Sequence, residues 1–162
     1  MNEHENPFPE ADAPRHAIWE MLVRRDIDAF LAADWTMVEA DFARDRFFGL
    51  HGRFLSNPDS WQLRFPDLES YRDEWLRQAR ETATKVYAEP LREALFGLTN
   101  LRDIDLRGVR AVAHKKFDGT IERGTGEVER LNWQTLYFCA HLDGQWRITG
   151  FVGYLPHPLR AR

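Results

Sequence analysis

The sequence predicts an α+β fold in which helices come first and a mostly antiparallel sheet follows. Three observations lead to this class. Apolar residues recur at helical spacing over most of the chain before Gly97, and the apolar period changes to two after Asp103. The chain then closes with two long strands, 131–142 and 145–155, around the pair Asp143-Gly144, which tolerates the positive φ angles of a type I′ hairpin turn. This hairpin is the most strongly predicted element.

Length, charge and cysteine content exclude several classes of protein. A chain of 162 residues is long enough for one domain that buries roughly 70% of its unfolded surface. The single cysteine, Cys139, and the absence of close histidine pairs predict no disulfide, no metal site and no cofactor. A net charge of −4 with both signs interleaved argues against nucleic acid, and no segment resembles a membrane span or a signal peptide. We therefore expect a cytoplasmic, soluble protein.

The first third of the chain predicts two helices after a mobile lead-in. Residues 1–11 are polar and contain two prolines, so the single domain is expected over 12–156, with a tail at 157–162. Asp12 is a suitable cap for a helix that ends near Arg25, and Asp26 for a second helix with an apolar stripe up to Phe42.

Asp34 and Asp41 have two interpretations. On one continuous helix both carboxylates would fall on or beside the apolar stripe and face the interior. Alternatively the helix breaks, Asp34 caps a new turn at Trp35, and Asp41 lies near a frayed end.

The middle of the chain predicts short strands, two helices and the start of the sheet. The segment 47–52 is expected to be a strand that ends in His51, and 61–65 is expected to be a short edge strand. Asp67 caps a third helix, and a helical turn beginning at Leu91 is closed by a glycine cap. The glycines beyond are interpreted as a cap at Gly97, a bulge at Gly108, a turn at Asp118-Gly119 and a turn at 124–126.

The order of these elements resembles the nuclear transport factor 2-like superfamily, and within it the SnoaL-like proteins. The resemblance rests on 25–30 after a short helix, 47–49 in an early strand, and the closing segment 143–148. It implies a cystatin-like cone, in which a strongly curved sheet wraps around the N-terminal helices and leaves an internal pocket. Members include steroid isomerases, polyketide cyclases, dehydratases, epoxide hydrolases and modules without catalysis, so the fold does not fix the chemistry. The positions that carry proton transfer in the isomerases fall near Ile18, Leu50 and Leu136, which cannot transfer protons.

The candidate catalytic residues are His51, Asp34 and Asp41. An imidazole at the end of a strand near the pocket mouth can act as a base near neutral pH. An acid from Asp34 or Asp41 would orient it, or would abstract a proton itself after burial against Trp35 and Phe42. The alternative for His51 is a hydrogen bond to a neighbouring loop.

The closing hairpin supplies the candidate ligand contacts. Aligning the turns places Asn132, Gln134 and Phe138 on the concave face, where the two amides would bind a ligand carbonyl. The opposite face, with Trp133 and Tyr137, would then be convex and form a homodimer interface, although one bulge would exchange the faces. The expected pocket walls are Trp19, Trp35, Phe42, Trp75, Phe138 and Phe151. We expect a small, largely apolar ligand, with cofactor-free isomerase, cyclase or dehydratase chemistry or, alternatively, a non-catalytic binding or dimerisation module.

Overall fold

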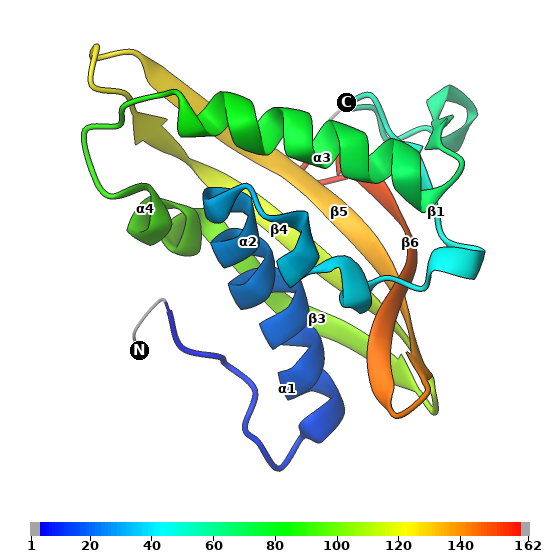
Figure 1. The fold of residues 1–162 in the computed structure, drawn as a ribbon. Coiled ribbons are helices and arrows are strands. Elements are labelled where there is room, and N and C mark those ends of the chain that lie inside the picture. Colours follow the sequence, from blue (N-terminus) through cyan, green and yellow to red (C-terminus); the bar gives the residue numbers. More distant parts are fainter. Residues whose placement is uncertain (1–3, 160–162) are drawn as a thin grey trace.

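In the computed structural model, which describes residues 4–159, helices cover one face of a six-stranded sheet (Figure 1). The strand order is β2-β1-β6-β5-β4-β3. All neighbouring strands are antiparallel except β1 and β6, which are parallel. The predicted α+β class and the antiparallel character of the sheet are therefore confirmed.

The first two predicted helices form one continuous helical rod. It consists of α1 (Ala13–Trp19), a π-helical stretch η1 (Glu20–Arg25) and α2 (Asp26–Ala32). Asp26 was expected to cap a second helix, which is wrong, because Arg25 and Asp26 keep right-handed helical dihedrals and the chain never leaves the helix. The rod ends at Ala33, which adopts the left-handed conformation with φ of 50°. Asp34 then caps the 3-10 turn η2 (Trp35–Met37), as the second interpretation of this residue proposed.

In the described part of the chain, three further 3-10 turns and two short strands, β1 (Phe48–His51) and β2 (Gln62–Phe65), precede helices α3 and α4. Helix α3 (Leu68–Ala83) begins where predicted, since the Asp67 carboxylate accepts a hydrogen bond from the backbone N–H of Ser70 at 2.8 Å. Helix α4 (Leu91–Leu98) contains Gly97 within it, so the predicted glycine cap is wrong. The chain passes from α4 directly into β3 with Thr99 as the C-cap, which leaves no position for a left-handed residue.

The remaining strands are β3 (Thr99–Arg107), β4 (Arg110–Glu122), β5 (Val128–Leu142) and β6 (Gln145–Leu155). The Asp143-Gly144 turn is confirmed, with φ of 51° and 82°. Gly108 forms the hairpin turn between β3 and β4 and has φ of 57°, so the bulge predicted there is wrong. The turn predicted at Asp118-Gly119 is also wrong, because both residues lie inside β4. A Cβ at Gly119 would lie 2.8 Å from the Cβ of Leu98, so this glycine allows α4 to approach the sheet.

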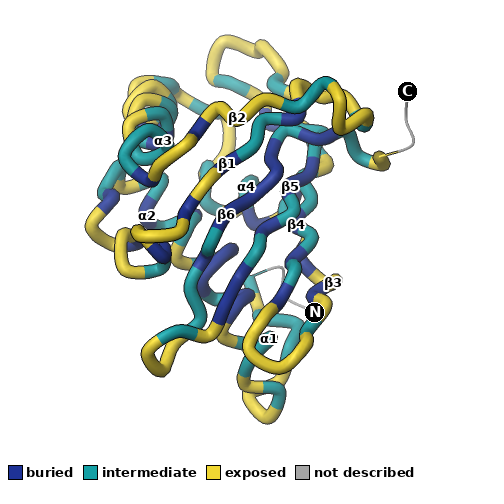
Figure 2. Tube along the Cα trace, turned by 90° about the vertical axis from the view of Figure 1, so that its right-hand side faces the viewer, coloured by how far each residue is buried: buried dark blue, intermediate teal, exposed yellow. Residues whose placement is uncertain are grey.

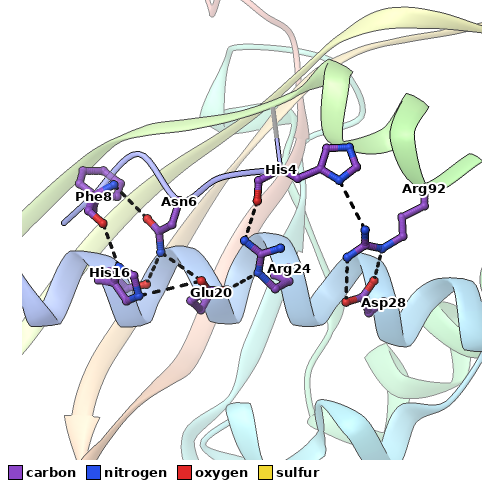
Figure 3. Close-up of polar contacts among 8 residues, drawn as sticks. All are labelled: His4, Asn6, Phe8, His16, Glu20, Arg24, Asp28 and Arg92. Atoms are coloured by element: carbon purple, nitrogen blue, oxygen red, sulfur yellow. Dashed lines mark hydrogen bonds and ion pairs between the residues drawn. The ribbon is translucent and has the colours of Figure 1, made fainter. Parts of the chain in front are cut away.

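The described part of the N-terminal segment lies along the helical rod (Figure 3). The Asn6 amide donates to the carbonyl of His16, and a ring nitrogen of His16 lies 2.8 Å from the carbonyl of Phe8. Arg24 donates to the carbonyl of His4 at 2.6 Å, and the His4 ring stacks on Phe96. These contacts fix the path of the segment against α1 and η1, whereas its mobility remains a prediction.

The core fills the space between the rod, α3 and the inner face of the sheet. Figure 2 shows buried positions running along the central strands and exposed positions gathered at the turns. Within residues 4–159, no helix is both long enough and apolar enough to cross a membrane. The layer between helices and sheet is also where the largest polar side chain of the core, Lys115, lies.

Candidate functional site

A cavity of about 410 Å³ lies between α2, α3, α4 and the inner face of β4, β5 and β6. Its volume falls in the range of small-molecule pockets, roughly 300–1,000 Å³. Within residues 4–159, nine aromatic side chains contribute to its wall: Phe30, Tyr71, Trp75, Tyr87, Phe117, Trp133, Tyr137, Phe151 and Tyr154.

Lys115 contributes the cavity's most deeply buried charge. Strand β4 alternates, and Ala111, Ala113 and Lys115 share the buried face. The Lys115 side chain is only 1% exposed, and its ammonium donates hydrogen bonds to the backbone carbonyl of Leu22 and to the Asp26 carboxylate, the latter at 2.9 Å. The same ammonium lies 5.3 Å from the ring centre of Phe117. A buried lysine therefore points from the sheet towards the helical rod.

The π-helical stretch η1 explains why the Leu22 carbonyl can accept this bond. In a regular α-helix that carbonyl would accept the N–H of Asp26. Here the N–H of Asp26 binds the carbonyl of Val23 instead, and the Leu22 carbonyl receives the lysine. Stretches of π-helix often occur at functional sites.

Asp26 completes an ion pair across the cavity wall. One carboxylate oxygen accepts from Lys115, and the other accepts a long hydrogen bond, 3.4 Å, from the indole N–H of Trp75. The Asp26 side chain keeps 33% of its surface accessible and lines the cavity. Both partners therefore line the cavity, and Asp26 is the more accessible of the two.

Two tyrosines extend this group of polar side chains. Tyr71 and Tyr137 both line the cavity, and each affects the pKa of the other. Burial raises the pKa of both phenols well above the usual 10, and the nearby negative charge of Asp26 raises it further. Both phenols are therefore neutral hydrogen-bond donors at physiological pH. We refer to Asp26, Lys115, Tyr71 and Tyr137 as the buried polar cluster.

A second polar group lies farther along the same strands, where the side chains are partly exposed. Glu129 accepts hydrogen bonds from Lys85 at 3.3 Å and from the Tyr87 hydroxyl at 3.4 Å, and all three line the cavity. Glu129 pairs with Ile121, six residues beyond Lys115 on β4, which corresponds to roughly 20 Å of strand. The cavity therefore extends from the buried polar cluster to a partly exposed charged rim formed by Lys85, Tyr87 and Glu129.

The two faces of β5 are the reverse of those expected. Trp133, Thr135 and Tyr137 line the cavity, so these aromatics are not a convex dimer surface. Side chains alternate regularly along β5 itself, so the reversal comes from the face that the alignment of turns assigned to the strand. The β5–β6 ladder shifts register between Gln134 and Leu136 and again between Phe138 and Cys139.

The side-chain amides of Asn132 and Gln134, expected to bind a ligand carbonyl, therefore make their hydrogen bonds outside the cavity. The Asn132 amide donates to Asp118 at 3.0 Å, and the Gln134 amide donates to the carbonyl of Pro156 at 2.9 Å. Neither residue lines the cavity, and neither does Phe138.

Of the aromatic wall residues expected from the sequence, Trp75 and Phe151 line the cavity. Trp19, Trp35 and Phe42 are buried in the core outside it, and the Trp35 and Phe42 rings stack 5.0 Å apart. Trp35 and Phe42 follow the end of the rod and pack on Tyr71 of α3, whereas Trp19 packs against Phe96 of α4.

The three candidate catalytic residues lie apart from the cavity and make no contact with one another. His51 stacks on Tyr154 at 4.2 Å, and its Nδ1 accepts from the backbone N–H of Arg53. Asp34 accepts from the N–H and hydroxyl of Thr36, and Asp41 binds Arg25 through both oxygens. None of the three lines the cavity. The catalytic roles of His51, Asp34 and Asp41 stay untested predictions without support from this geometry.

We expect His51 to titrate below the usual value of 6.5. Burial lowers its pKa first, and the positive charges of Arg64 and Arg53 lower it further. The unfolded chain would bind the proton near pH 6.5, whereas the folded chain resists it. The fold therefore loses stability as the pH falls below about 6.5 towards the lower pKa of the folded state.

NMR titration of the His51 ring would measure this pKa directly. In the Arg64→Gln variant the value should move back towards 6.5, whereas Arg102→Gln serves as a surface control. A wild-type value at or above 6.5 would contradict the expectation.

The buried polar cluster escaped the sequence analysis, although one signal pointed to it. Lys115 shares the alternating parity of Ala111 and Ala113, and a lysine on the apolar face of a strand requires a buried partner. The sequence pattern assigns Asp26 as a helix cap, and a capping carboxylate does not need to be buried. Over residues 4–159, no three His, Cys, Asp or Glu side chains gather so as to hold a metal ion.

Comparisons with known proteins identify the fold. No protein-family model matches the chain, and no curated protein does either. Solved structures match over most of their length. A conserved protein from Planctomyces limnophilus superposes with a TM-score of 0.57 at 14% identity, covering 91% of this chain and 97% of that one. A nuclear transport factor 2-like superfamily protein from Salmonella enterica gives 0.55 at 16% identity, covering 88% and 91%.

A ketosteroid isomerase-like protein from Erwinia carotovora atroseptica gives a TM-score of 0.51 at 16% identity and covers 92% of this chain and 98% of that one. The chain therefore has the nuclear transport factor 2-like, cystatin-like fold, as the sequence predicted. Identities this low define the fold and leave the activity to the residues of the cavity.

Proposed function

We propose that this protein binds a small, largely apolar molecule in the cavity between the helices and the sheet. One observation carries the proposal: aromatic walls enclose about 410 Å³ and converge on a small set of polar side chains. Small-molecule sites commonly combine an apolar wall with a few oriented polar groups. A molecule of about two fused rings would bury its apolar surface against Phe117, Leu131 and Trp133.

Acid/base catalysis is the second candidate, and it would have to use the buried polar cluster. Asp26 is the carboxylate that lines the cavity beside two phenols and an ammonium. Its two oxygens already accept hydrogen bonds from Lys115 and Trp75, so both are engaged by the protein before a ligand binds. Binding is therefore the function that the geometry supports best.

Indane, a neutral two-ring hydrocarbon, is a suitable probe of the proposed site. Isothermal titration should give saturable one-to-one binding with a Kd of about 1 mM or lower. Leu131→Trp, which adds an indole to the cavity wall, should weaken binding at least about tenfold, since the added ring occupies the space of the probe.

Leu136→Trp is the matched control, because it makes the same exchange on the same strand at a residue that does not line the cavity. It should leave the Kd within a factor of about two. Absence of saturable binding to the wild type, or equal weakening by both variants, would overturn the proposal.

A further inference from the structure

The buried polar cluster offers hydrogen-bond donors without a free acceptor. An ammonium carries three N–H groups, and Lys115 uses two of them, on Leu22 and Asp26. Over residues 4–159 the structure gives the third N–H no acceptor, and the side chain lines the cavity. Tyr71 and Tyr137 also line the cavity, and each neutral phenol has one O–H that can donate.

The acceptors of the cluster are already occupied. One Asp26 oxygen accepts from Lys115 and the other from Trp75. A ligand hydroxyl would therefore find donors, but its own proton would have to share a carboxylate oxygen that already accepts a hydrogen bond. A carbonyl oxygen, which only accepts, fits this set of partners better.

The charge of the cluster selects between a neutral and an anionic acceptor. The positive charge of Lys115 and the negative charge of Asp26 cancel, and both phenols are neutral. A carboxylate ligand would leave one uncompensated negative charge among apolar walls, which is strongly unfavourable. A neutral carbonyl would bring no net charge.

We infer that the ligand of this cavity carries a neutral carbonyl oxygen, as in a ketone, aldehyde, ester or amide, and that Lys115 binds this oxygen. This inference rests on the proposed function. The apolar body of the ligand extends from Lys115 along β4 and β5 past Phe117 and Trp133 towards the charged rim. Lys115 is thus the specificity-determining residue, and Asp26 positions its ammonium.

Three probes with one ring frame test this inference: 1-indanone, indane and indane-1-carboxylate. Isothermal titration gives the ratio of the Kd of indane to that of 1-indanone for each protein. Lys115→Met removes the donor and keeps the length of the side chain, so this ratio should fall about tenfold or more. The carboxylate should bind the wild type more weakly than the ketone.

Lys116→Met is the matched control. Lys116 is the next residue of β4, does not line the cavity, and pairs with Asp103 at 2.7 Å. This variant should leave the ratio unchanged. If Lys115→Met folds poorly by near-ultraviolet circular dichroism, Lys115→Met combined with Asp26→Asn removes both charges and the same ratio is measured.

Each outcome assigns failure to one of the two proposals. Wild-type binding of both probes with a ratio that Lys115→Met leaves unchanged overturns the carbonyl inference and preserves the binding function. Tighter binding of the carboxylate than of the ketone overturns the choice of a neutral group. Binding of neither neutral probe overturns the proposed function, and the inference with it.

Discussion

Replacing Asp26 with alanine should lower the free energy of unfolding by about 3–5 kcal/mol, because the ammonium of Lys115 would be left buried without its counter-ion. Lys115 is 1% exposed, so solvent cannot replace the carboxylate. Urea denaturation at pH 7 measures the loss.

The reverse replacement should cost less. In Lys115→Met the carboxylate of Asp26 loses its partner but keeps 33% of its surface accessible, and the Leu22 carbonyl loses a donor. We expect a loss of about 2 kcal/mol. Lys116→Met, which breaks only a partly exposed ion pair with Asp103, should cost about 1 kcal/mol or less. Equal losses for Asp26→Ala and Lys116→Met would show that the pair is not buried.

Phe151→Ala should destabilise the protein by about 3–5 kcal/mol, the usual cost of removing a buried aromatic ring. Phe151 is 3% exposed, and the centres of the Tyr71 and Tyr137 rings lie 4.9 Å and 5.9 Å from its own. The packing is tight enough that a Cβ at Gly49 would lie 2.8 Å from the Phe151 ring.

The control for Phe151→Ala is Leu63→Ala on the edge strand β2. Leu63 is 59% exposed, so its truncation should change the free energy of unfolding by about 0.5 kcal/mol or less. Guanidinium denaturation of both variants gives the comparison. A loss below about 1.5 kcal/mol for Phe151→Ala would mean that the neighbouring rings collapse into the space it leaves.

Local chemistry made part of the fold predictable. The Asp67 cap and the Asp143-Gly144 turn depend on a few neighbouring residues, and both occur where expected. The same dipeptide at Asp118-Gly119 lies within a strand, because the approach of Leu98 from α4 leaves no space for a side chain there. The dipeptide Asp-Gly therefore forms a turn at 143–144 and part of a strand at 118–119, and the contact of Gly119 with the distant residue Leu98 distinguishes the two positions.

The candidate site was less predictable for a related reason. Side chains alternate regularly along β5, but the alternation alone does not specify which of its two faces packs against the helices. Of the expected ligand contacts and wall residues, Trp75 and Phe151 line the cavity. The positions of Asp26 and Lys115 follow from a contact between residues 89 positions apart in the sequence.

The π-helical stretch η1 also leaves the two ends of the helical rod in the same rotational phase. Each residue of an α-helix advances the direction of its side chain by about 100°. A π-helical turn holds one more residue than an α-helical turn, so the rod takes in one extra residue for the same rotation and stays unbroken. Deleting one residue from Glu20–Arg25 would thus return this stretch to regular α-helix with the faces of α1 and α2 still in phase, and the Leu22 carbonyl would then accept the N–H four residues on in place of the lysine. The extra residue of this one turn therefore serves the contact with Lys115, while the packing of α1 does not depend on it.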